Sequence, residues 1–189
     1  MISPTAFTEA GLGFRDGFCP AKKDGLWGFI SRAGRWNDIP GPCDKLAPFQ
    51  IGLAGVRRPD GVWGFIDKTM QWRIPPTTYT MADEGVREFY IKAQNNGDWG
   101  FLDARGGWHP VLQPCAILTS FGSGLAGVCL PSSGIWGFVY DEVPEKWAIP
   151  PINFTHADAG FREEMCLVKQ NGNWCFIDIH GKVLFMLNL

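Results

Sequence analysis

The chain has 189 residues, of which 46% are hydrophobic and 19% are charged, and its formal net charge at pH 7 is −2. This composition excludes an intrinsically disordered chain, and the slight acidity provides no basic surface for nucleic acid. No apolar run approaches the roughly 18 residues of a membrane-spanning helix, so no membrane segment is expected. The 24 Gly and 14 Pro favour short strands joined by many turns over long helices.

A short motif, Gly-x-Trp-Gly-Phe followed by Ile, Leu or Val, recurs five times at intervals of 36 to 38 residues. The last copy has Cys175 where the others have the second Gly. A second Trp, or Val183 in the last copy, follows nine to eleven residues after the first. A period of this length indicates a repeat architecture. The Trp residues at these repeat positions are Trp27, Trp63, Trp99, Trp136, Trp174, Trp36, Trp72, Trp108 and Trp147.

Each copy of the motif is expected to form the middle strand of a short meander. A turn precedes the first Trp in every copy, because Gly and Asn accept the positive φ of a tight hairpin. In chain order these turns are Asp24-Gly25, Asp60-Gly61, Asn96-Gly97, Ser133-Gly134 and Asn171-Gly172. A second turn follows the motif and begins with Asp67, Asp103 or Asp178 in three copies. An Ile-Pro pair after the second Trp, as at Ile74-Pro75, is predicted to end strand pairing because Pro has no N–H.

The motif and its period resemble the WG-repeat (KWG) family, and the resemblance covers essentially the whole chain. It implies a β-rich array of five repeats, found chiefly in bacteria, that acts as an interaction module without catalytic residues. We therefore expect a single domain, 1–189. Its repeats are expected at approximately 1–42, 43–78, 79–114, 115–151 and 152–189.

Both faces of each middle strand are apolar, so each meander must be covered by a neighbour. The segments before the first Trp alternate between two patterns, which predicts a period of two repeats and the stacking of repeat n over repeat n+2. The expected fold is all-β, an open superhelical β-solenoid of three-stranded β-meanders, with a five-bladed propeller-like ring as the alternative. The Gly beside each Trp is expected to admit a neighbouring backbone, and Cys175 to mark a last repeat without a following neighbour.

The sequence contains no catalytic, phosphate-binding or metal-binding motif, so we predict that the chain is not an enzyme and needs no cofactor or metal. Asp67, Asp103 and Asp178 recur at a turn start, which favours a structural role over acid–base chemistry. The six Cys include no Cys-x-x-Cys pair and are interpreted as reduced packing residues. The first twenty residues do not resemble a secretory signal, so the expected location is the cytoplasm.

Partner-binding residues are expected where the repeat pattern is broken, because the fold itself does not require those residues. The breaks are an Arg pair before the second hairpin, acids at matching positions in the third and fifth repeats, and a lengthened turn in the fourth repeat. The candidate partner-binding residues are Arg57, Arg58, Asp83, Glu84, Tyr140, Asp141, Glu142, Glu145, Lys146 and Asp158.

Three functions remain open at this point. The first is a non-enzymatic protein-binding module, in one version a stoichiometric inhibitor or immunity protein against a secreted bacterial toxin. The second is a carbohydrate-binding module that uses exposed Trp, because indole rings stack well on sugars. The third is an enzyme of unrecognised type that gathers polar groups from several repeats. The expected partner is thus another protein or a carbohydrate, and neither nucleic acid nor a membrane.

Overall fold

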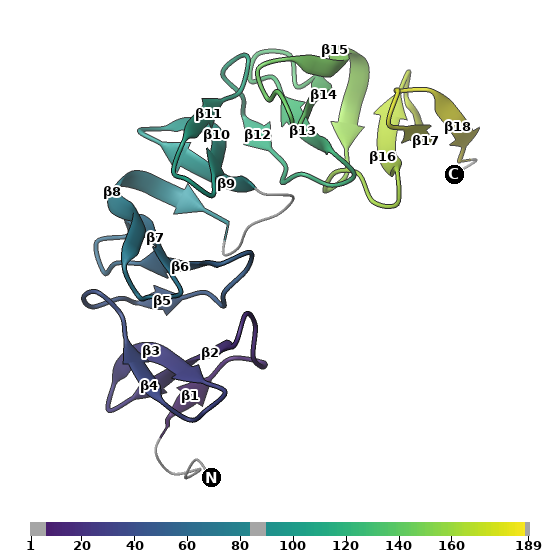
Figure 1. The fold of residues 1–189 in the computed structure, drawn as a ribbon. Coiled ribbons are helices and arrows are strands. Elements are labelled where there is room, and N and C mark those ends of the chain that lie inside the picture. Colours follow the sequence, from purple (N-terminus) through teal and green to yellow (C-terminus); the bar gives the residue numbers. More distant parts are fainter. Residues whose placement is uncertain (1–6, 84–89, 188–189) are drawn as a thin grey trace. The chain divides into compact units, whose positions relative to one another are not determined.

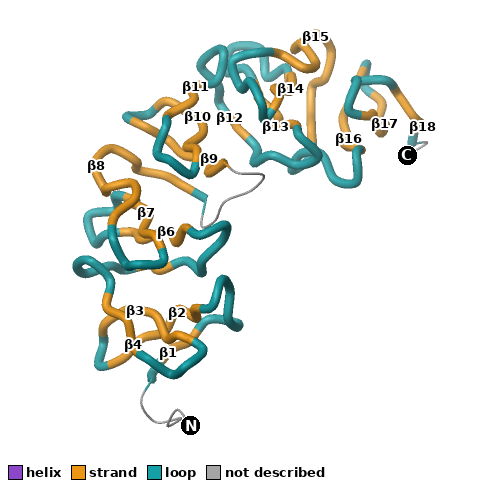
Figure 2. Tube along the Cα trace, viewed as in Figure 1, coloured by secondary structure: helices purple, strands orange, loops and turns teal. Residues whose placement is uncertain are grey.

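The computed structural model describes residues 7–83 and 90–187. These residues form antiparallel strands joined by turns, and they include no helix that could cross a membrane (Figure 1 and Figure 2). The prediction of an all-β fold is therefore confirmed. The strands are β1 (Glu9–Ala10), β2 (Phe18–Lys23), β3 (Leu26–Ser31), β4 (Trp36–Asp38), β5 (Lys45–Leu46), β6 (Leu53–Arg57), β7 (Trp63–Asp67), β8 (Trp72–Ala82), β9 (Tyr90–Asn95), β10 (Asp98–Asp103), β11 (Trp108–Pro110), β12 (Ile117–Leu118), β13 (Leu125–Cys129), β14 (Trp136–Tyr140), β15 (Trp147–Ala157), β16 (Met165–Gln170), β17 (Asn173–Asp178) and β18 (Val183–Met186).

The strands form three antiparallel sheets in which hydrogen-bonded neighbours follow one another along the chain. The sheets contain β1 to β4, β5 to β11 and β12 to β18. By its internal contacts the chain divides into two compact units, each considered separately below. The first comprises the described residues of Met1–Val86, Ala93–Gly97 and Ala104–Gly106, and the second those of Arg87–Lys92, Asp98–Asp103 and Gly107–Leu189.

Five hairpins contain the Trp motif, and each is named here after its first Trp. The Trp27, Trp99 and Trp174 hairpins close with two-residue turns in which both residues have positive φ, as a type I′ turn requires. Wider loops close the other two hairpins, where the N–H of Arg58 donates to the carbonyl of Val62 and that of Leu130 to the carbonyl of Ile135, both at 2.9 Å. The expected alternation between repeats thus includes an alternation of tight turns and wide loops. The hairpins are Trp27 (β2–β3), Trp63 (β6–β7), Trp99 (β9–β10), Trp136 (β13–β14) and Trp174 (β16–β17).

The recurrent Asp residues stabilise the second turn of their hairpins. Asp67 Oδ1 accepts the backbone N–H of Thr69 at 2.8 Å, and Asp178 Oδ1 accepts that of Lys182 at 2.9 Å. Asp103 Oδ1 accepts the backbone N–H four residues further on at 2.8 Å. The predicted structural role of these carboxylates is confirmed, because each satisfies a backbone donor within its own turn.

The Ile-Pro-Pro segments do not end strands, contrary to the prediction. β8 continues through Pro75-Pro76 and β15 through Pro150-Pro151. In β8 the register shifts at this point, so that Ile74 pairs with β7, whereas Tyr79 pairs with both β7 and β9. Proline is tolerated because it lies at a bulge where the strand changes partner. β8 and β15 therefore join two hairpins within one sheet.

Each hairpin also has a fourth strand that the sequence did not indicate. β1, β5 and β12 contain two residues each and pair with the first strand of the hairpin that follows. The second halves of β8 and β15 take the same position beside β9 and β16. The expectation of three-stranded meanders was incomplete, because a two-residue strand is too short to show an alternating pattern.

The Gly after the first Trp is covered by the second Trp of the same repeat. A Cβ on Gly64 would lie 2.7 Å from the Trp72 ring and 2.9 Å from the carbonyl oxygen of Ile74. The space that Gly leaves is therefore filled within the repeat and not by a neighbouring repeat. At Cys175 the second Trp is replaced by Val183, which leaves room for a side chain. A missing neighbour is therefore not needed to explain Cys175, contrary to the expectation. The same arrangement occurs at Gly28, Gly100 and Gly137.

Pairs of Phe side chains connect consecutive hairpins in the core. In each pair one Phe belongs to a middle strand, and the other precedes the following hairpin. Consecutive repeats therefore pack on each other, and the expected stacking of repeat n over repeat n+2 is wrong at these junctions. The pairs, with the distances between ring centroids, are Phe29–Phe49 (4.7 Å), Phe101–Phe121 (4.2 Å) and Phe138–Phe161 (5.0 Å).

Candidate functional site

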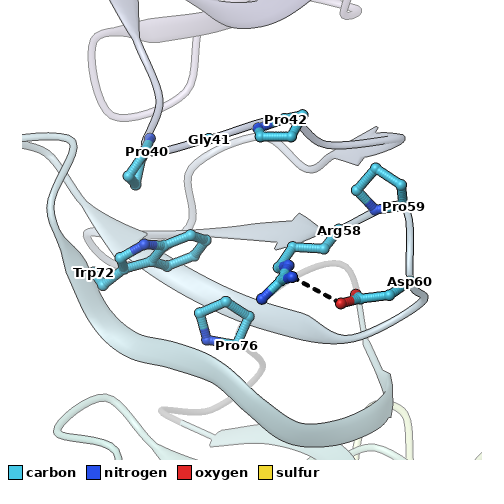
Figure 3. A pocket seen from close by; sticks show the side chains of 8 residues that line it. All are labelled: Pro40, Gly41, Pro42, Arg58, Pro59, Asp60, Trp72 and Pro76. Atoms are coloured by element: carbon cyan, nitrogen blue, oxygen red, sulfur yellow. Dashed lines mark ion pairs between the residues drawn. The ribbon is translucent and has the colours of Figure 1, made fainter.

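The Trp72 side chain lines a pocket of about 430 Å³ in the first compact unit, called the Trp72 pocket below (Figure 3). Its walls come from the turn after β4, the loop between β6 and β7, and β8. In Figure 3 the Trp72 ring and the proline rings surround one space, with Arg58 and Asp60 beside it. The lining residues are Pro40, Gly41, Pro42, Arg58, Pro59, Asp60, Trp72 and Pro76.

Local backbone constraints hold the walls of this pocket in place. Trp72 rests on Gly64, where a Cβ would collide with its ring. Pro40 and Pro42 flank Gly41, whose φ of 96° turns the chain between β4 and β5. Proline side chains have almost no rotamer freedom, so the pocket is largely preformed before any ligand arrives.

An ion pair forms the polar side of the pocket. Arg58 Nη2 lies 2.9 Å from Asp60 Oδ2, and both side chains are 47% exposed. An exposed pair of this kind stabilises a protein by about 0–1 kcal/mol. A carboxylate or hydroxyl of a ligand can therefore replace Asp60 as the partner of Arg58 at little cost.

Arg57, the other member of the predicted Arg pair, does not line the Trp72 pocket. Its Nε and Nη2 donate to Asp44 Oδ1 and Oδ2 at 2.8 and 2.9 Å. The hydrogen bonds from Arg57 hold the pKa of Asp44 below its usual value. Arg57 thus connects β6 to the segment before β5, and Arg58 alone of the pair faces the pocket.

The lengthened turn between β14 and β15 folds back onto its own compact unit. Glu145 Oε1 lies 3.6 Å from His109 Nδ1, and His109 Nε2 lies 3.2 Å from Asp103 Oδ2. The backbone N–H of Asp141 donates to the carbonyl before β13 at 2.9 Å. This predicted site therefore offers individual exposed side chains on an anchored loop. The exposed residues are Tyr140, Glu142, Glu145 and Lys146.

The predicted acidic residues lie on separate segments. Asp83 follows β8 and is half-buried, and Glu84 falls outside the described residues. Asp158 follows β15, is exposed, and donates its backbone N–H to the carbonyl of Leu167 at 3.0 Å. Of the predicted partner-binding residues that the structure describes, Arg58 is the one that lines the Trp72 pocket.

The cysteines are poorly suited to nucleophilic chemistry. Burial raises the pKa of Cys43 and Cys115 to about 11 and that of Cys166 to about 12. Thiolate, the reactive form, is therefore scarce in these side chains at neutral pH. Across residues 7–83 and 90–187, no group of three or more His, Cys, Asp or Glu side chains is placed to hold a metal ion.

Sequence reasoning missed the Trp72 pocket because it interpreted the prolines as strand stops. The signal present in the sequence was a set of prolines that come close to one Trp once the strands are paired. Pro40 and Pro42 follow β4, Pro59 lies in the neighbouring loop, and Pro76 lies in β8. Recognising this grouping required the pairing of β5 to β8, which the sequence alone did not provide.

The family described as a WG containing repeat matches two segments of the chain, residues 63–97 and 145–174. The first segment includes β7, β8 and β9, and the second includes β15 and β16. No curated protein sequence matches the chain. The comparison thus detects the WG repeat in two places along this chain.

Several β-propeller structures are similar to the chain. Hsv2 from Kluyveromyces marxianus has a TM-score of 0.55 at 7% identity, over 92% of this chain and 60% of that one. BamB from Moraxella catarrhalis has a TM-score of 0.45 at 11% identity, over 93% and 62%. The WD40 β-propeller domain of Doa1 has a TM-score of 0.43 at 11% identity, over 96% and 72%. The chain thus spans less than two thirds of Hsv2 and BamB, and the likeness to Hsv2 concerns the fold alone.

Proposed function

We propose that this chain is a non-enzymatic protein-binding module. The observation that supports the proposal is the Trp72 pocket, where one indole and four proline rings form a preformed apolar surface beside the Arg58–Asp60 pair. Trp and Arg are enriched among the residues that dominate the energetics of protein interfaces. Rigid walls also reduce the entropic cost of association. A partner segment that places an apolar side chain on Trp72 and a carboxylate on Arg58 fits this site.

In its most specific form, the proposal is a cytoplasmic immunity protein that inhibits a secreted bacterial toxin. Such a partner binds one to one, through an interface of about 1,600 Å² in total. The Trp72 pocket accounts for only part of that area. The exposed side chains of the β14–β15 loop and Asp158 are further candidate contacts within this proposal.

Affinity purification from the source cell with the full chain as bait tests the proposal. We expect one stoichiometric protein partner. Arg58→Glu should weaken its binding at least about tenfold, because the substitution replaces a cation at the pocket with an anion and costs at least about 1.4 kcal/mol. Arg32→Glu is the matched control, since Arg32 is exposed in the same compact unit and does not line the pocket.

The two arms of this experiment contradict different parts of the proposal. If no stoichiometric partner is recovered, the chain is not a protein-binding module of this kind. If Arg58→Glu and Arg32→Glu have equal effects on a recovered partner, then binding does not use the Trp72 pocket.

The same pocket supports carbohydrate binding as a second candidate function. Trp72 offers an aromatic face, and Arg58 and Asp60 offer a hydrogen-bond donor and acceptor beside it. Sugar rings stack on indole while their hydroxyls bond to such groups. A glycan that binds should change the Trp fluorescence of the wild type and not that of Arg58→Glu. Unchanged emission across a glycan panel would exclude this candidate.

For the whole chain, we propose five WG repeats in an open superhelical array, with the five-bladed ring as the alternative. β8 and β15 support the array, because each links two hairpins in one continuous sheet. The likeness to Hsv2 supports the ring. The four-stranded form of each repeat suits both arrangements.

A further inference from the structure

Three of the junctions between consecutive hairpins have a knob and a socket. Between the Trp63 and Trp99 hairpins the knob position falls on Val86, outside the described residues. The knob is the Phe two residues before the tight turn that leads into a hairpin, and the socket is the Phe two residues after the first Trp of the preceding hairpin. At three junctions the two rings lie 4.2–5.0 Å apart, and the exposed fraction of every Phe involved is 5% or less. The knobs are Phe49, Phe121 and Phe161, and their sockets are Phe29, Phe101 and Phe138.

A hydrogen bond accompanies the knob at two of these junctions. Asp16 Oδ2 accepts the N–H of Gly52 at 2.7 Å, and Ser123 Oγ accepts the N–H of Glu164 at 3.1 Å. In both cases the acceptor is the first turn residue on the socket side, and the donor is the second turn residue on the knob side. Each of these two junctions therefore combines the apolar contact between knob and socket with one hydrogen bond, called the clamp below.

Phe14 is a knob without a socket among the described residues. It precedes the turn formed by Asp16 and Gly17, in which both residues have positive φ, as in the equivalent turns. Phe14 is 42% exposed, and Leu12 beside it is fully exposed. Both line a groove of about 460 Å³ together with Arg15 and Trp27. The first compact unit thus presents the apolar surface that the other knobs bury.

Phe176 is a socket without a knob among the described residues. It lies on β17 and is only half-buried, whereas the three occupied sockets are 0% exposed. Strand β18 lies beside β17 (Figure 1). Its Phe185 pairs with Phe176 across the sheet, with ring centroids 4.9 Å apart, and is 48% exposed. The second compact unit thus presents an apolar face of the kind that receives a knob elsewhere.

We propose that the Phe14 knob of one copy of this chain docks on the Phe176–Phe185 socket of a second copy, in a head-to-tail contact. This inference rests on the open array proposed above, since a closed ring would bring the two ends together within one chain. The Phe14 knob is the expected ligand of this socket, because at the three internal junctions a Phe at the same repeat position packs on a socket Phe in the same chain order. The clamp extends to this contact, because Glu163 has the position of Asp16 and Ser123. The Glu163 carboxylate of the second copy would accept the N–H of Gly17 from the copy that supplies the Phe14 knob.

The contact joins two different surfaces, so it leaves one knob and one socket available after every addition. Such heterologous contacts produce rings or chains of many copies and not a closed symmetric dimer. The wild-type protein should therefore form assemblies beyond the dimer as its concentration rises.

Light scattering after size-exclusion chromatography and analytical ultracentrifugation test the proposal with the full chain. We expect Phe14→Arg and Phe185→Arg each to abolish assembly, and Glu163→Ala to weaken it about 3- to 10-fold through loss of one hydrogen bond. Phe14 is 42% exposed and Phe185 is 48% exposed, so both positions should accept Arg without loss of the fold, and circular dichroism should be unchanged. Ile152→Arg, at a 71% exposed position on β15, is the control that should assemble like the wild type.

Mixing the two defective variants is the decisive measurement. Phe14→Arg retains its socket and Phe185→Arg retains its knob, so an equimolar mixture should form a one-to-one dimer and no larger species. A wild type that stays monomeric at all concentrations, or a mixture that stays monomeric, would overturn the proposal. Arg58→Glu should assemble normally, so that failure of the partner-binding proposal and failure of this one are distinguishable.

Discussion

Gly137 and Trp147 show how single residues depend on each other in this fold. A Cβ on Gly137 would lie 2.7 Å from the Trp147 ring and 2.9 Å from the carbonyl oxygen of Ile149. Where Val183 takes the place of the second Trp, a side chain is accepted at the equivalent position, and Cys175 is fully buried there. The Gly is therefore required chiefly by the indole that covers it.

The first prediction concerns this pair. Gly137→Ala should lower the free energy of unfolding by about 1–3 kcal/mol, because the added methyl group overpacks the contact with Trp147. In a Trp147→Val background the added cost of Gly137→Ala should be smaller. Urea unfolding of the four proteins of this double-mutant cycle measures the coupling. Additivity within about 0.5 kcal/mol would contradict the pairing.

The second prediction concerns three thiols, of which Cys166 is buried and Cys43 and Cys115 are half-buried. Because burial raises the pKa of Cys43 and Cys115 to about 11 and that of Cys166 to about 12, these side chains should stay protonated at pH 8. A thiol reagent should therefore leave them unmodified in the folded protein and modify all six cysteines after unfolding in urea. Mass spectrometry of the modified peptides identifies each site. Rapid modification of Cys166 in the native state would contradict its burial.

The third prediction concerns the turn carboxylates. The hydrogen bond from the Thr69 hydroxyl lowers the pKa of Asp67, and the backbone N–H of Lys182 lowers that of Asp178, from an unperturbed value of 3.8. A carboxyl whose pKa is lower in the folded state stabilises that state fully above the unfolded pKa and loses this effect as pH falls through the folded pKa. Asp67→Asn and Asp178→Asn should therefore be less stable than the wild type near pH 7. The difference should shrink well below pH 3.8, as measured by urea midpoints, and a difference independent of pH would contradict this assignment.

At the scale of elements, local sequence signals located turns, whereas they did not predict which strands pair or which side chains pack together. The tight turns before Trp27, Trp99 and Trp174 were predicted correctly, because a positive φ is a local requirement that Gly and Asn reveal directly. Before Trp63 and Trp136 wider loops take the place of the expected tight turns. The continuation of β8 through Pro75-Pro76 was missed, since it depends on a second strand, β9, that accepts the pairing beyond the bulge. The Phe knobs were equally hidden, because a Phe in a loop gives no sign of the ring that it will meet.

The fourth prediction compares two equivalent knobs. Phe161→Ala should lower the free energy of unfolding by about 3–5 kcal/mol, because Phe161 is 3% exposed and packs on Phe138. Phe14→Ala should change it by less than about 0.5 kcal/mol, because an exposed side chain loses little on truncation. Chemical unfolding at a concentration where the protein is monomeric gives both values. Equal effects on the free energy of unfolding would contradict the assignment of Phe161 as a buried knob and Phe14 as an exposed one.

At the scale of the whole molecule, the sequence predicted the all-β class and the two-repeat period, and strand pairing shows one origin of that period. Sheets are continuous through β8 and β15 and are interrupted after β4 and after β11. Ile-Pro-Pro occurs at the continuous connections, whereas β4 is followed by Pro40-Gly41-Pro42 and β11 ends at Pro110. The sequence alone could not separate these cases, because both contain prolines and only the pairing partners differ. The Trp72 pocket, formed by prolines on both sides of the first interruption, was missed for the same reason.

The fifth prediction distinguishes the open array from the closed ring. A compact globule of this length has a radius of gyration of about 16 Å, and a five-bladed ring should be close to that value. An open array places its terminal repeats far apart and should have a clearly larger radius. Small-angle X-ray scattering of the wild type, at a concentration where it is monomeric, makes the measurement on a single copy and keeps Phe14 in place. A radius near 16 Å would favour the ring, in which Phe14 and Phe176 would meet inside one chain.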